Sequence, residues 1–214
     1  MHSLIIWDFN GTILDDVGIG IQAVNKLLLK RNIKPLECVD DYYKVFGFPI
    51  IEYYKRLGFD FEKEDYNTVA NEWVKEYNAL ESSAPIRPFV KELLEKIRAL
   101  GIPQIILSAS EKNMLSRQIA SLGISEYFDE ILGADNIYAY GKQETALDWM
   151  KQKNIDSALL IGDTEHDAEV AKAIGASCVL VSGGHQNEKT LKKCGVTVAT
   201  PQNICDIIIS LLTT

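Results

Sequence analysis

The sequence is poor in cysteine, in clustered basic residues and in long apolar runs, and each shortage excludes a class of protein. It has 214 residues and four cysteines, and no two of these form a CxxC pair, so we expect neither a zinc site nor a disulfide framework. No stretch approaches the roughly 18 consecutive apolar residues that a membrane span needs. Lys and Arg total 22 against 30 Asp and Glu, which gives a net charge of -8 and makes nucleic acid an unexpected partner.

The N-terminal stretch MHSLIIWDF has too short an apolar run for a signal peptide and lacks a small-residue cleavage site. Together with the lack of a cysteine framework, this favours a reducing compartment, so we expect a cytoplasmic protein with no membrane partner. The acidic balance has a further consequence for function. An anionic substrate must be attracted by a local metal ion or a well-placed lysine, because the field of the whole chain opposes it.

The chain contains an alternation of short apolar runs and helical patterns. The apolar runs, which are typical of buried parallel strands, cover residues 4–7, 105–107, 130–132, 158–161 and 178–181. Amphipathic helical patterns cover residues 88–100, 111–122, 142–153 and 165–174. This alternation predicts an α/β domain with a doubly wound, Rossmann-like parallel sheet.

Residues 17–84 break this alternation, because they show helical periodicity and many aromatic residues but no strand pattern. The polar, proline-containing stretch at residues 82–85 is a hinge candidate. We therefore expect a discontinuous core domain of residues 1–14 and 86–214, interrupted by an α-helical cap domain over residues 15–85.

Polar residues follow several of the predicted strands at the point where each strand ends. Ligands in open parallel sheets bind beyond the carboxyl ends of the strands, so these residues are the candidate site. They are Asp8, Ser108, Lys142 at the start of a helix, and Asp163.

Each candidate also has an ordinary structural explanation. The pair Asn10-Gly11 is a common turn signal, and Ser108 or Ser110 can cap the following helix. Asp163 and Asp167 can complement a helix dipole, and Lys142 can lie on a solvated surface. Taken together, however, these explanations require a coincidence, because two acids, a hydroxyl and an ammonium group all fall at one edge of one sheet.

Such a set of groups is suited to phosphoryl transfer. A carboxylate can attack phosphorus to form an aspartyl-phosphate. Two acids can hold Mg²⁺ through oxygen ligands, while a lysine and a serine can bind the phosphate oxygens on which charge spreads in the transition state.

The order of these residues resembles the haloacid dehalogenase superfamily, in its phosphoglycolate-phosphatase-like branch with a helical cap. The first family motif, a strand followed by Asp-x-Asp-Gly-Thr, is matched by DFNGT at residues 8–12. The second and third motifs are matched by Ser108 in IILSAS and Lys142 in YGKQETA. The fourth, Gly-Asp with a further Asp four residues on, is matched by GDTEHD at residues 162–167. The resemblance spans nearly the whole chain.

By this resemblance, Asp8 would be the catalytic nucleophile and a metal ligand. The other metal ligands would be the backbone carbonyl of Asn10, Asp163 and, as a nearby or outer partner, Asp167. The implied cofactor is Mg²⁺. The implied activity is a phosphatase that hydrolyses small phosphorylated metabolites through an aspartyl-phosphate.

The same resemblance implies a phosphate-binding set around the nucleophile. Ser108 and Lys142 would bind the transferring phosphoryl group, with Lys142 also counted as catalytic. Asn10, Gly11 and Thr12 would support the phosphate through the turn that follows the first strand.

Asn10 departs from the family pattern, in which an Asp at this position protonates the leaving group and then deprotonates water. An amide has no titratable proton, and general acid–base help is worth about 10² to 10⁴ in rate. Three outcomes follow for this chain. It could be a slow phosphatase for alkyl phosphates, an enzyme for substrates with good leaving groups, or a phosphate-responsive binding protein with little turnover.

Two other activities of the superfamily remain open in the sequence. Dehalogenases need no Mg²⁺ site, and the acids Asp163 and Asp167 count against that activity. Phosphonate C–P hydrolases also lack an acid two residues after the nucleophile and use a cap lysine as a Schiff base, for which Lys44 and Lys55 are the candidates.

Overall fold

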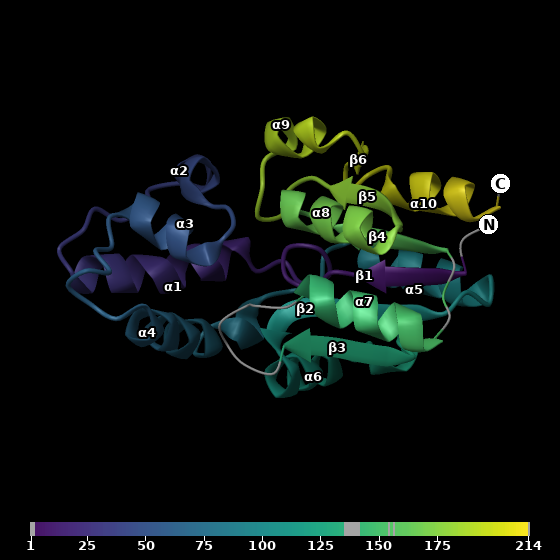
Figure 1. The fold of residues 1–214 in the computed structure, drawn as a ribbon, viewed down its shortest axis with the longest axis horizontal. Helices are drawn as coiled ribbons and strands as arrows, with labels where there is room; N and C mark the ends of the chain where they lie inside the picture. Colours follow the sequence, from purple (N-terminus) through teal and green to yellow (C-terminus); the bar gives the residue numbers. More distant parts are fainter. Residues whose placement is uncertain (1–2, 135–141, 154, 156, 214) are drawn as a thin grey trace. The chain divides into compact units, whose positions relative to one another are not determined.

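The computed structural model describes residues 3–134, 142–153, 155 and 157–213, with the side chains of residues 142 and 143 excepted. The chain divides into two compact units (Figure 1). One unit contains Met1–Leu14 and Ile86–Thr214, and the other contains Asp15–Pro85. We refer to them as the core unit and the inserted unit.

A six-stranded sheet forms the centre of the core unit. Its strands are β1 (Leu4–Trp7), β2 (Gln104–Glu111), β3 (Glu130–Ala134), β4 (Ala158–Gly162), β5 (Ser177–Val181) and β6 (Thr197–Ala199). They lie in the order β3-β2-β1-β4-β5-β6, and every neighbouring pair is parallel. The prediction of a doubly wound α/β fold is confirmed, and β6 is a strand that the sequence pattern did not indicate.

The strand order reverses at β1, because β2 and β3 extend the sheet on one side of it and β4 to β6 on the other. Such a reversal is the topological switch point at which doubly wound sheets bind ligands. The residue that follows β1 is Asp8. The topology therefore places this carboxylate at the centre of the ligand-binding edge.

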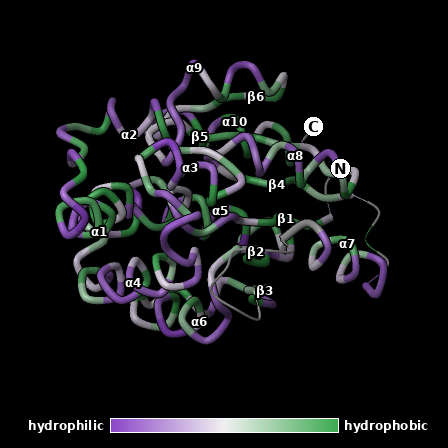
Figure 2. Tube along the Cα trace, turned by 60° about the vertical axis from the view of Figure 1, so that its left-hand side comes forward, coloured by the Kyte–Doolittle hydropathy of each residue, from purple (hydrophilic) through white to green (hydrophobic). Residues whose placement is uncertain are grey.

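Helices cover both faces of the sheet. They are α5 (Val90–Ala99), α6 (Lys112–Ser121), α7 (Lys142–Lys153), α8 (Glu165–Ile174), α9 (Glu188–Leu191) and α10 (Ile204–Thr213), with short 3-10 helices at Ser125–Tyr127 and Lys192–Cys194. Figure 1 shows α7 and α8 in front of the sheet and α5 behind it. Because both faces are covered, the strands are apolar along their length rather than alternating, as the hydrophobic colour of β1 and β4 in Figure 2 shows.

The packing behind this arrangement is a buried apolar cluster between the sheet and two helices. Ile6, Leu107 and Leu160 from three neighbouring strands contact Met150 of α7 and Val170 of α8 in one cluster. This cluster fixes the distance between the strands and the helices that follow them. It thereby sets the position of the strand ends, where the polar candidates lie.

The inserted unit is helical, as expected. Its helices are α1 (Val17–Lys30), α2 (Val39–Val45), α3 (Ile50–Leu57) and α4 (Tyr66–Asn78), followed by a 3-10 helix at Glu81–Ser83. Aromatic side chains form much of its core, because Tyr42, Tyr53 and Tyr54 are each less than 5% exposed and pack with their neighbours in one cluster.

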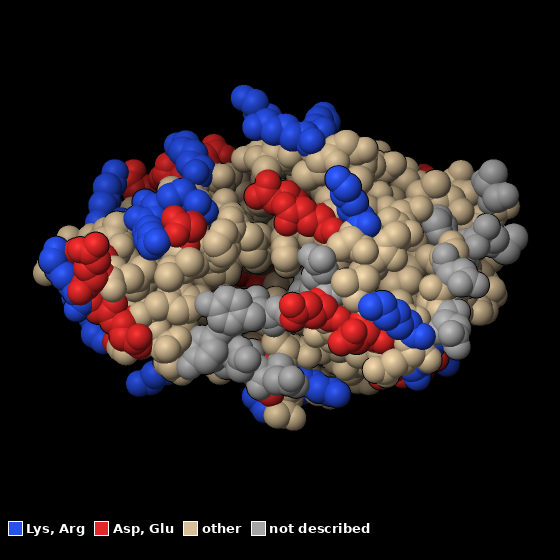
Figure 3. All heavy atoms as spheres, in the orientation of Figure 1, with Lys and Arg blue, Asp and Glu red and all other residues tan. Residues whose placement is uncertain are grey.

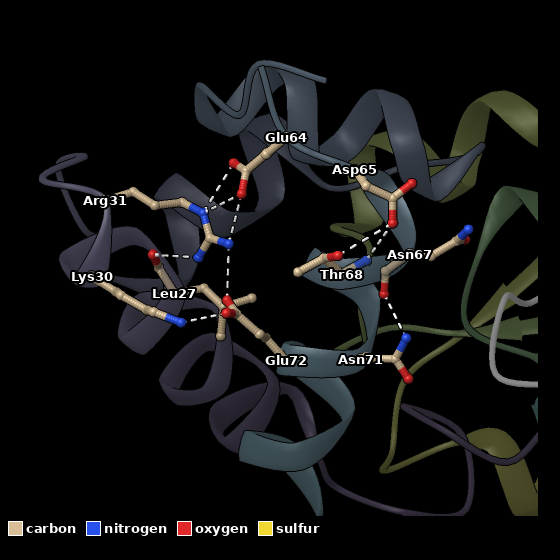
Figure 4. Close-up of polar contacts among 9 residues, drawn as sticks. All are labelled: Leu27, Lys30, Arg31, Glu64, Asp65, Asn67, Thr68, Asn71 and Glu72. Carbon is tan, nitrogen blue, oxygen red and sulfur yellow. Dashed lines mark hydrogen bonds and ion pairs between the residues drawn. The ribbon is translucent and has the colours of Figure 1, made fainter. Parts of the chain in front are cut away.

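A charged network joins the C-terminal end of α1 to the middle of α4 and to Glu64, which precedes α4 (Figure 4). The guanidinium of Arg31 contacts both carboxylate oxygens of Glu64, at 2.8 and 3.0 Å from Nε, and lies 2.9 Å from Glu72. Lys30 also donates to Glu72. Because Arg31 lies over the ring of Phe59 as well, the network is built on the edge of the aromatic core.

Lys and Arg are interspersed with Asp and Glu over the face shown in Figure 3. This agrees with the absence of basic clustering in the sequence. Among the described residues, no helix combines the length and the apolar character needed to cross a membrane.

Candidate functional site

Three buried carboxylates meet at the carboxyl edge of the sheet. One oxygen each from Asp8, Asp163 and Asp167 can be chosen so that all three lie within 4.8 Å of one another. Asp8 follows β1 and its backbone N–H donates to Ile161 of β4 at 2.9 Å, while Asp163 follows β4 directly. The neighbouring strands thus bring together three of the acids that the sequence marked.

The three carboxylates of this cluster need a bound proton or a cation to balance their charges. The pKa of Asp163 is raised to about 8, chiefly by burial and also by the negative charges of Asp8 and Asp167, while His185 acts in the opposite direction. Three ionised carboxylates in one buried site repel one another strongly, so one of them retains a proton or a cation must balance them. Hard oxygen ligands of this kind suit Mg²⁺, so the residues present fit the ion that the sequence implies.

Two donors from separate loops hold the carboxylate of Asp163. The Thr12 hydroxyl donates to Oδ1 at 3.0 Å, and the backbone N–H of His185 donates to Oδ2 at 2.5 Å. Thr12 and Asp163 are fully buried, so this hydrogen bond is shielded from water. The carboxylate therefore has a fixed orientation, which a metal site requires.

Asp167 serves as both a helix-capping residue and a member of the cluster. Its Oδ2 accepts from the backbone N–H of Asp163 at 3.2 Å, and from the backbone and hydroxyl of Thr164 at 3.0 and 2.7 Å. These contacts form the start of α8, which makes the ordinary explanation of Asp167 correct. They also fix its carboxylate beside Asp8 and Asp163, so the two roles coexist.

Glycines allow the backbone to approach these acids closely. A Cβ added at Gly11 or at Gly184 would lie 2.2 Å from Oδ2 of Asp163, and one at Gly162 would lie 2.4 Å from the Asp167 side chain. Gly11 also has a positive φ of 74°, which L side chains rarely adopt. Only glycine fits at these three positions without movement of the site.

Ser108 lies inside β2 and not at a helix cap. The strand continues to Glu111, whose side chain caps α6 by accepting from two backbone N–H groups. Ser108 is 4% exposed, and its hydroxyl accepts from the backbone N–H of Ser110 at 3.1 Å. The helix-capping alternative for Ser108 is therefore wrong.

Asn10 is held by a residue that the sequence did not single out for this role. The Ser110 hydroxyl donates to Oδ1 of Asn10 at 2.8 Å, which links the turn after β1 to the end of β2. A serine hydroxyl can donate to a carboxylate as well as to an amide, so this contact also accommodates an aspartate at position 10.

Lys142 is the first residue of α7, as the sequence predicted for the start of that helix. Its side chain lies outside the described part of the chain, as do residues 135–141 before it. The phosphate-binding and catalytic roles expected of Lys142 therefore remain predictions.

Sequence reasoning missed several residues that surround the cluster. Arg87 is 4% exposed and donates to the backbone carbonyl of Gly11, and His185 contacts Asp163 through its backbone. No motif marks Arg87. The pair Gly183-Gly184 before His185 was an available signal, because adjacent glycines after a strand indicate a close approach of the backbone.

Comparison with known proteins shows which family the chain resembles along most of its length. The model of the family described as haloacid dehalogenase-like hydrolase matches residues 5–181. A phosphoglycolate phosphatase of Pseudomonas fluorescens is 25% identical, over 88% of this chain and 72% of its own length. A phosphoglycolate phosphatase of Caulobacter vibrioides is also 25% identical, over 86% of this chain and 81% of its own.

Solved structures share the fold along the whole chain. A haloacid dehalogenase-like protein of unknown function from Agrobacterium tumefaciens has a TM-score of 0.79 at 22% identity, covering 99% of this chain and 100% of its own. A predicted phosphatase from Clostridium acetobutylicum has a TM-score of 0.78 at 21% identity, covering 98% and 99%. With the family match over most of its length, this chain belongs to the haloacid dehalogenase-like hydrolases.

Proposed function

We propose that this chain is a Mg²⁺-dependent phosphatase that hydrolyses small phosphorylated metabolites through an aspartyl-phosphate formed on Asp8. The observation that carries the proposal is the buried cluster of Asp8, Asp163 and Asp167 at the switch point of the sheet. The names of the curated relatives, phosphoglycolate phosphatases, support a phosphoric monoester as substrate.

Side-chain oxygens of Asp8 and Asp163 and the backbone carbonyl of Asn10 would hold the Mg²⁺, with Asp167 beside them. A bound Mg²⁺ neutralises the carboxylates and the charge of the substrate phosphate. The raised pKa of Asp163 supports this assignment, because a cation is what allows all three acids to be ionised together.

In the first step, a carboxylate oxygen of Asp8 attacks phosphorus and forms a P–O bond, while the bond from phosphorus to the leaving oxygen breaks. The leaving oxygen takes a proton from water. In the second step, water attacks the same phosphorus, the bond to Asp8 breaks, and inorganic phosphate leaves with the carboxylate restored. Ser108, Lys142, Gly11 and Thr12 bind the phosphate oxygens during both displacements.

Asn10 gives this mechanism its particular character, because it can hydrogen-bond to the leaving oxygen or to water but cannot exchange a proton. Substrates whose leaving group departs without protonation, such as aryl or acyl phosphates, are therefore favoured over alkyl phosphates. General acid catalysis raises the rate by a factor of about 10² to 10⁴. We expect the rate on aryl or acyl phosphates to exceed that on alkyl phosphates by a factor of this size.

The leaving-group preference can be tested with the Asn10→Asp variant. The initial rates on p-nitrophenyl phosphate and on an alkyl monophosphate are compared between the variant and the natural protein. We expect a large gain on the alkyl substrate and a small one on the aryl substrate, and equal gains would contradict the preference. Intact mass must confirm the amide in the natural protein, because Asn-Gly pairs deamidate.

The nucleophile can be tested by substitution at position 8. Asp8→Asn removes the attacking charge but keeps the shape, so we expect every Mg²⁺-dependent phosphatase activity to be lost. Asp206→Asn makes the same change at an exposed acid of α10 and should leave the rate unchanged. Residual turnover by the Asp8 variant would exclude the aspartyl-phosphate mechanism.

A weakly active phosphate-binding or regulatory protein is the alternative that Asn10 favours. The two functions differ in the lifetime of the aspartyl-phosphate, because an enzyme hydrolyses it quickly whereas a regulator holds it. Acid quenching at increasing times after an acyl phosphate is added, followed by mass spectrometry, measures that lifetime. A phosphorylated state that persists for minutes would favour the regulatory function.

The structure counts against a phosphonate C–P hydrolase. A Schiff-base lysine needs a lowered pKa, but the Lys44 ammonium donates to Asp41, and this hydrogen bond raises the pKa of Lys44. The Lys55 ammonium donates to Glu52 at 2.7 Å. Borohydride treatment with phosphonoacetaldehyde should therefore trap no adduct on either lysine.

A further inference from the structure

A buried arginine lies beside the phosphate-binding turn. Arg87 is 4% exposed, although burying a charged group is costly unless it is well hydrogen-bonded. Its Nη1 donates to the Gly11 carbonyl at 2.5 Å and its Nη2 donates to the Ser182 carbonyl at 2.7 Å. The guanidinium also lies 5.4 Å from the centroid of the Phe89 ring. Such contacts hold a planar cation in one orientation.

The two carbonyls belong to the two loops that hold the central acid of the site. Gly11 directly precedes Thr12, whose hydroxyl donates to Asp163, and Ser182 lies three residues before His185, whose backbone N–H donates to the same carboxylate. Arg87 therefore joins the turn after β1 to the loop after β5.

The geometry of the peptide bond extends this constraint from the Gly11 carbonyl to the N–H of Thr12. In a trans peptide, the C=O of one residue and the N–H of the next point in opposite directions. The hydrogen bond from the guanidinium holds the Gly11 carbonyl in one orientation. The direction of the Thr12 N–H is thereby fixed as well. Charge-assisted hydrogen bonds are about twice as strong as neutral ones, and they polarise the peptide so that its N–H becomes a better donor.

We propose that Arg87 is a positioning residue of the phosphoryl-transfer site. Its guanidinium holds the Gly11-Thr12 peptide and the 182–186 loop, so that the Thr12 N–H is aimed at the transferring phosphoryl group and Asp163 keeps its two donors. This role rests on the proposed function and adds to it a cation that no family motif supplies. Arg87 acts through the backbone and need not touch the substrate.

The test compares Arg87→Met and Arg87→Lys with the control Arg98→Met. Arg98 lies at the far end of α5, is exposed, and also stacks on an aromatic ring, Tyr127, so its substitution removes a similar side chain away from the site. Removal of a preorganised donor costs about 10² to 10³ in kcat. We expect a loss of about 10² in kcat for Arg87→Met on p-nitrophenyl phosphate, with KM raised less than about threefold.

Arg87→Lys keeps the charge but can reach only one carbonyl at a time, so it should recover part of the lost kcat. A substitution that affected folding alone would lower the unfolding temperature. It would not lower the kcat of the folded protein while leaving its KM nearly unchanged. A kcat within about twofold of the natural protein in either folded variant would overturn the proposal. If Arg87→Met does not fold, the Arg87→Lys comparison decides.

Binding of orthovanadate in the presence of Mg²⁺, measured by calorimetry, separates this proposal from the proposed function. Vanadate mimics five-coordinate phosphorus and needs no turnover. Its affinity should fall in Arg87→Met by a factor similar to that in kcat, while Arg98→Met stays unchanged. An unchanged vanadate affinity would overturn the role of Arg87 whether or not the natural protein is a phosphatase.

Discussion

At the scale of the residue, Asp163 is the side chain on which the contacts of the site converge. Thr12 and His185 donate to its two oxygens, and its backbone N–H donates to Asp167. The backbone of Gly184 passes so close that it leaves no space for a side chain. The position of Asp163 is therefore determined by several loops at once and depends on small residues as much as on acids.

This crowding predicts the effect of Gly184→Ala on metal binding. The new Cβ would lie 2.2 Å from Oδ2 of Asp163, so either the carboxylate or the loop must move. We expect Mg²⁺ affinity, measured by calorimetry, to fall at least about tenfold, because displaced ligands and their supporting contacts cost about that much.

Gly123→Ala is the matched control for this variant. Gly123 has a φ of 67°, and an added Cβ would meet no atom within 4 Å. The substitution should lower the free energy of unfolding by about 1 kcal/mol through backbone strain and leave Mg²⁺ affinity unchanged. If Gly184→Ala binds Mg²⁺ as tightly as this control, Asp163 is not a ligand.

At the scale of the element, α1 and α4 of the inserted unit are joined by the network around Arg31. Arg31→Lys keeps the charge but loses the two-pronged contact with Glu64 and the simultaneous contact with Glu72. We expect the free energy of unfolding in urea to fall by about 1 kcal/mol. The control is Lys34→Arg, at an exposed position paired with Glu37. It should change the free energy of unfolding by a few tenths of a kcal/mol at most. Equal stability of all three proteins would show that the network contributes nothing.

The aromatic core between the helices of the inserted unit predicts a loss of stability at alkaline pH. Burial raises the pKa of both Tyr53 and Tyr54 above the usual value of 10. Below pH 10 both hydroxyls are protonated in the folded and the unfolded chain. Above pH 10 the unfolded chain releases these protons first, so the free energy of unfolding falls as pH rises.

Tyr54→Phe removes one of the two ionisable hydroxyls and with it that group's contribution to the pH dependence of stability. Between pH 9 and pH 11 the natural protein should lose about 1.4 kcal/mol more stability than the variant, since one pKa unit corresponds to about that energy. Urea unfolding at the two pH values measures the difference. An identical pH dependence in both proteins would contradict the burial of this hydroxyl in the folded state.

The strands and helices also show what local sequence can reveal. The start of β1, the whole of α7 and the whole of α8 lie where the apolar pattern placed them. The end of β2 was misjudged, because three of the residues 108–111 are polar and the strand nevertheless continues through them to Glu111. Strand β6 was missed, because Thr197–Ala199 is too short to show a period.

At the scale of the whole molecule, the alternation of apolar runs and helical patterns was enough to predict the fold class, and the order of motifs was enough to predict the family. The acids at the strand ends could also be foreseen, because parallel strands bring their carboxyl ends to one edge. Arg87, Ser110 and His185 could not, because they act through single hydrogen bonds between loops distant in sequence. Periodicity and motif spacing carry no information about such contacts.

The net charge of the whole molecule affects how a phosphate ester can be bound. With a net charge of -8, the chain repels a phosphate ester at long range. Attraction must therefore come from the site itself, through the metal, the backbone amides of the turn at residues 9–12 and the cations near it. Substrate binding therefore depends on the immediate surroundings of Asp8.

The most direct test of that claim is to detect the phosphorylated form of the enzyme. The protein is mixed with Mg²⁺ and an acyl phosphate, quenched in acid, digested and analysed by mass spectrometry. We predict a gain of one phosphoryl group on the peptide that contains Asp8, dependent on Mg²⁺ and absent from Asp8→Asn. Phosphate release with no phosphorylated peptide at any quench time, or with the phosphoryl group on another residue, would contradict the account.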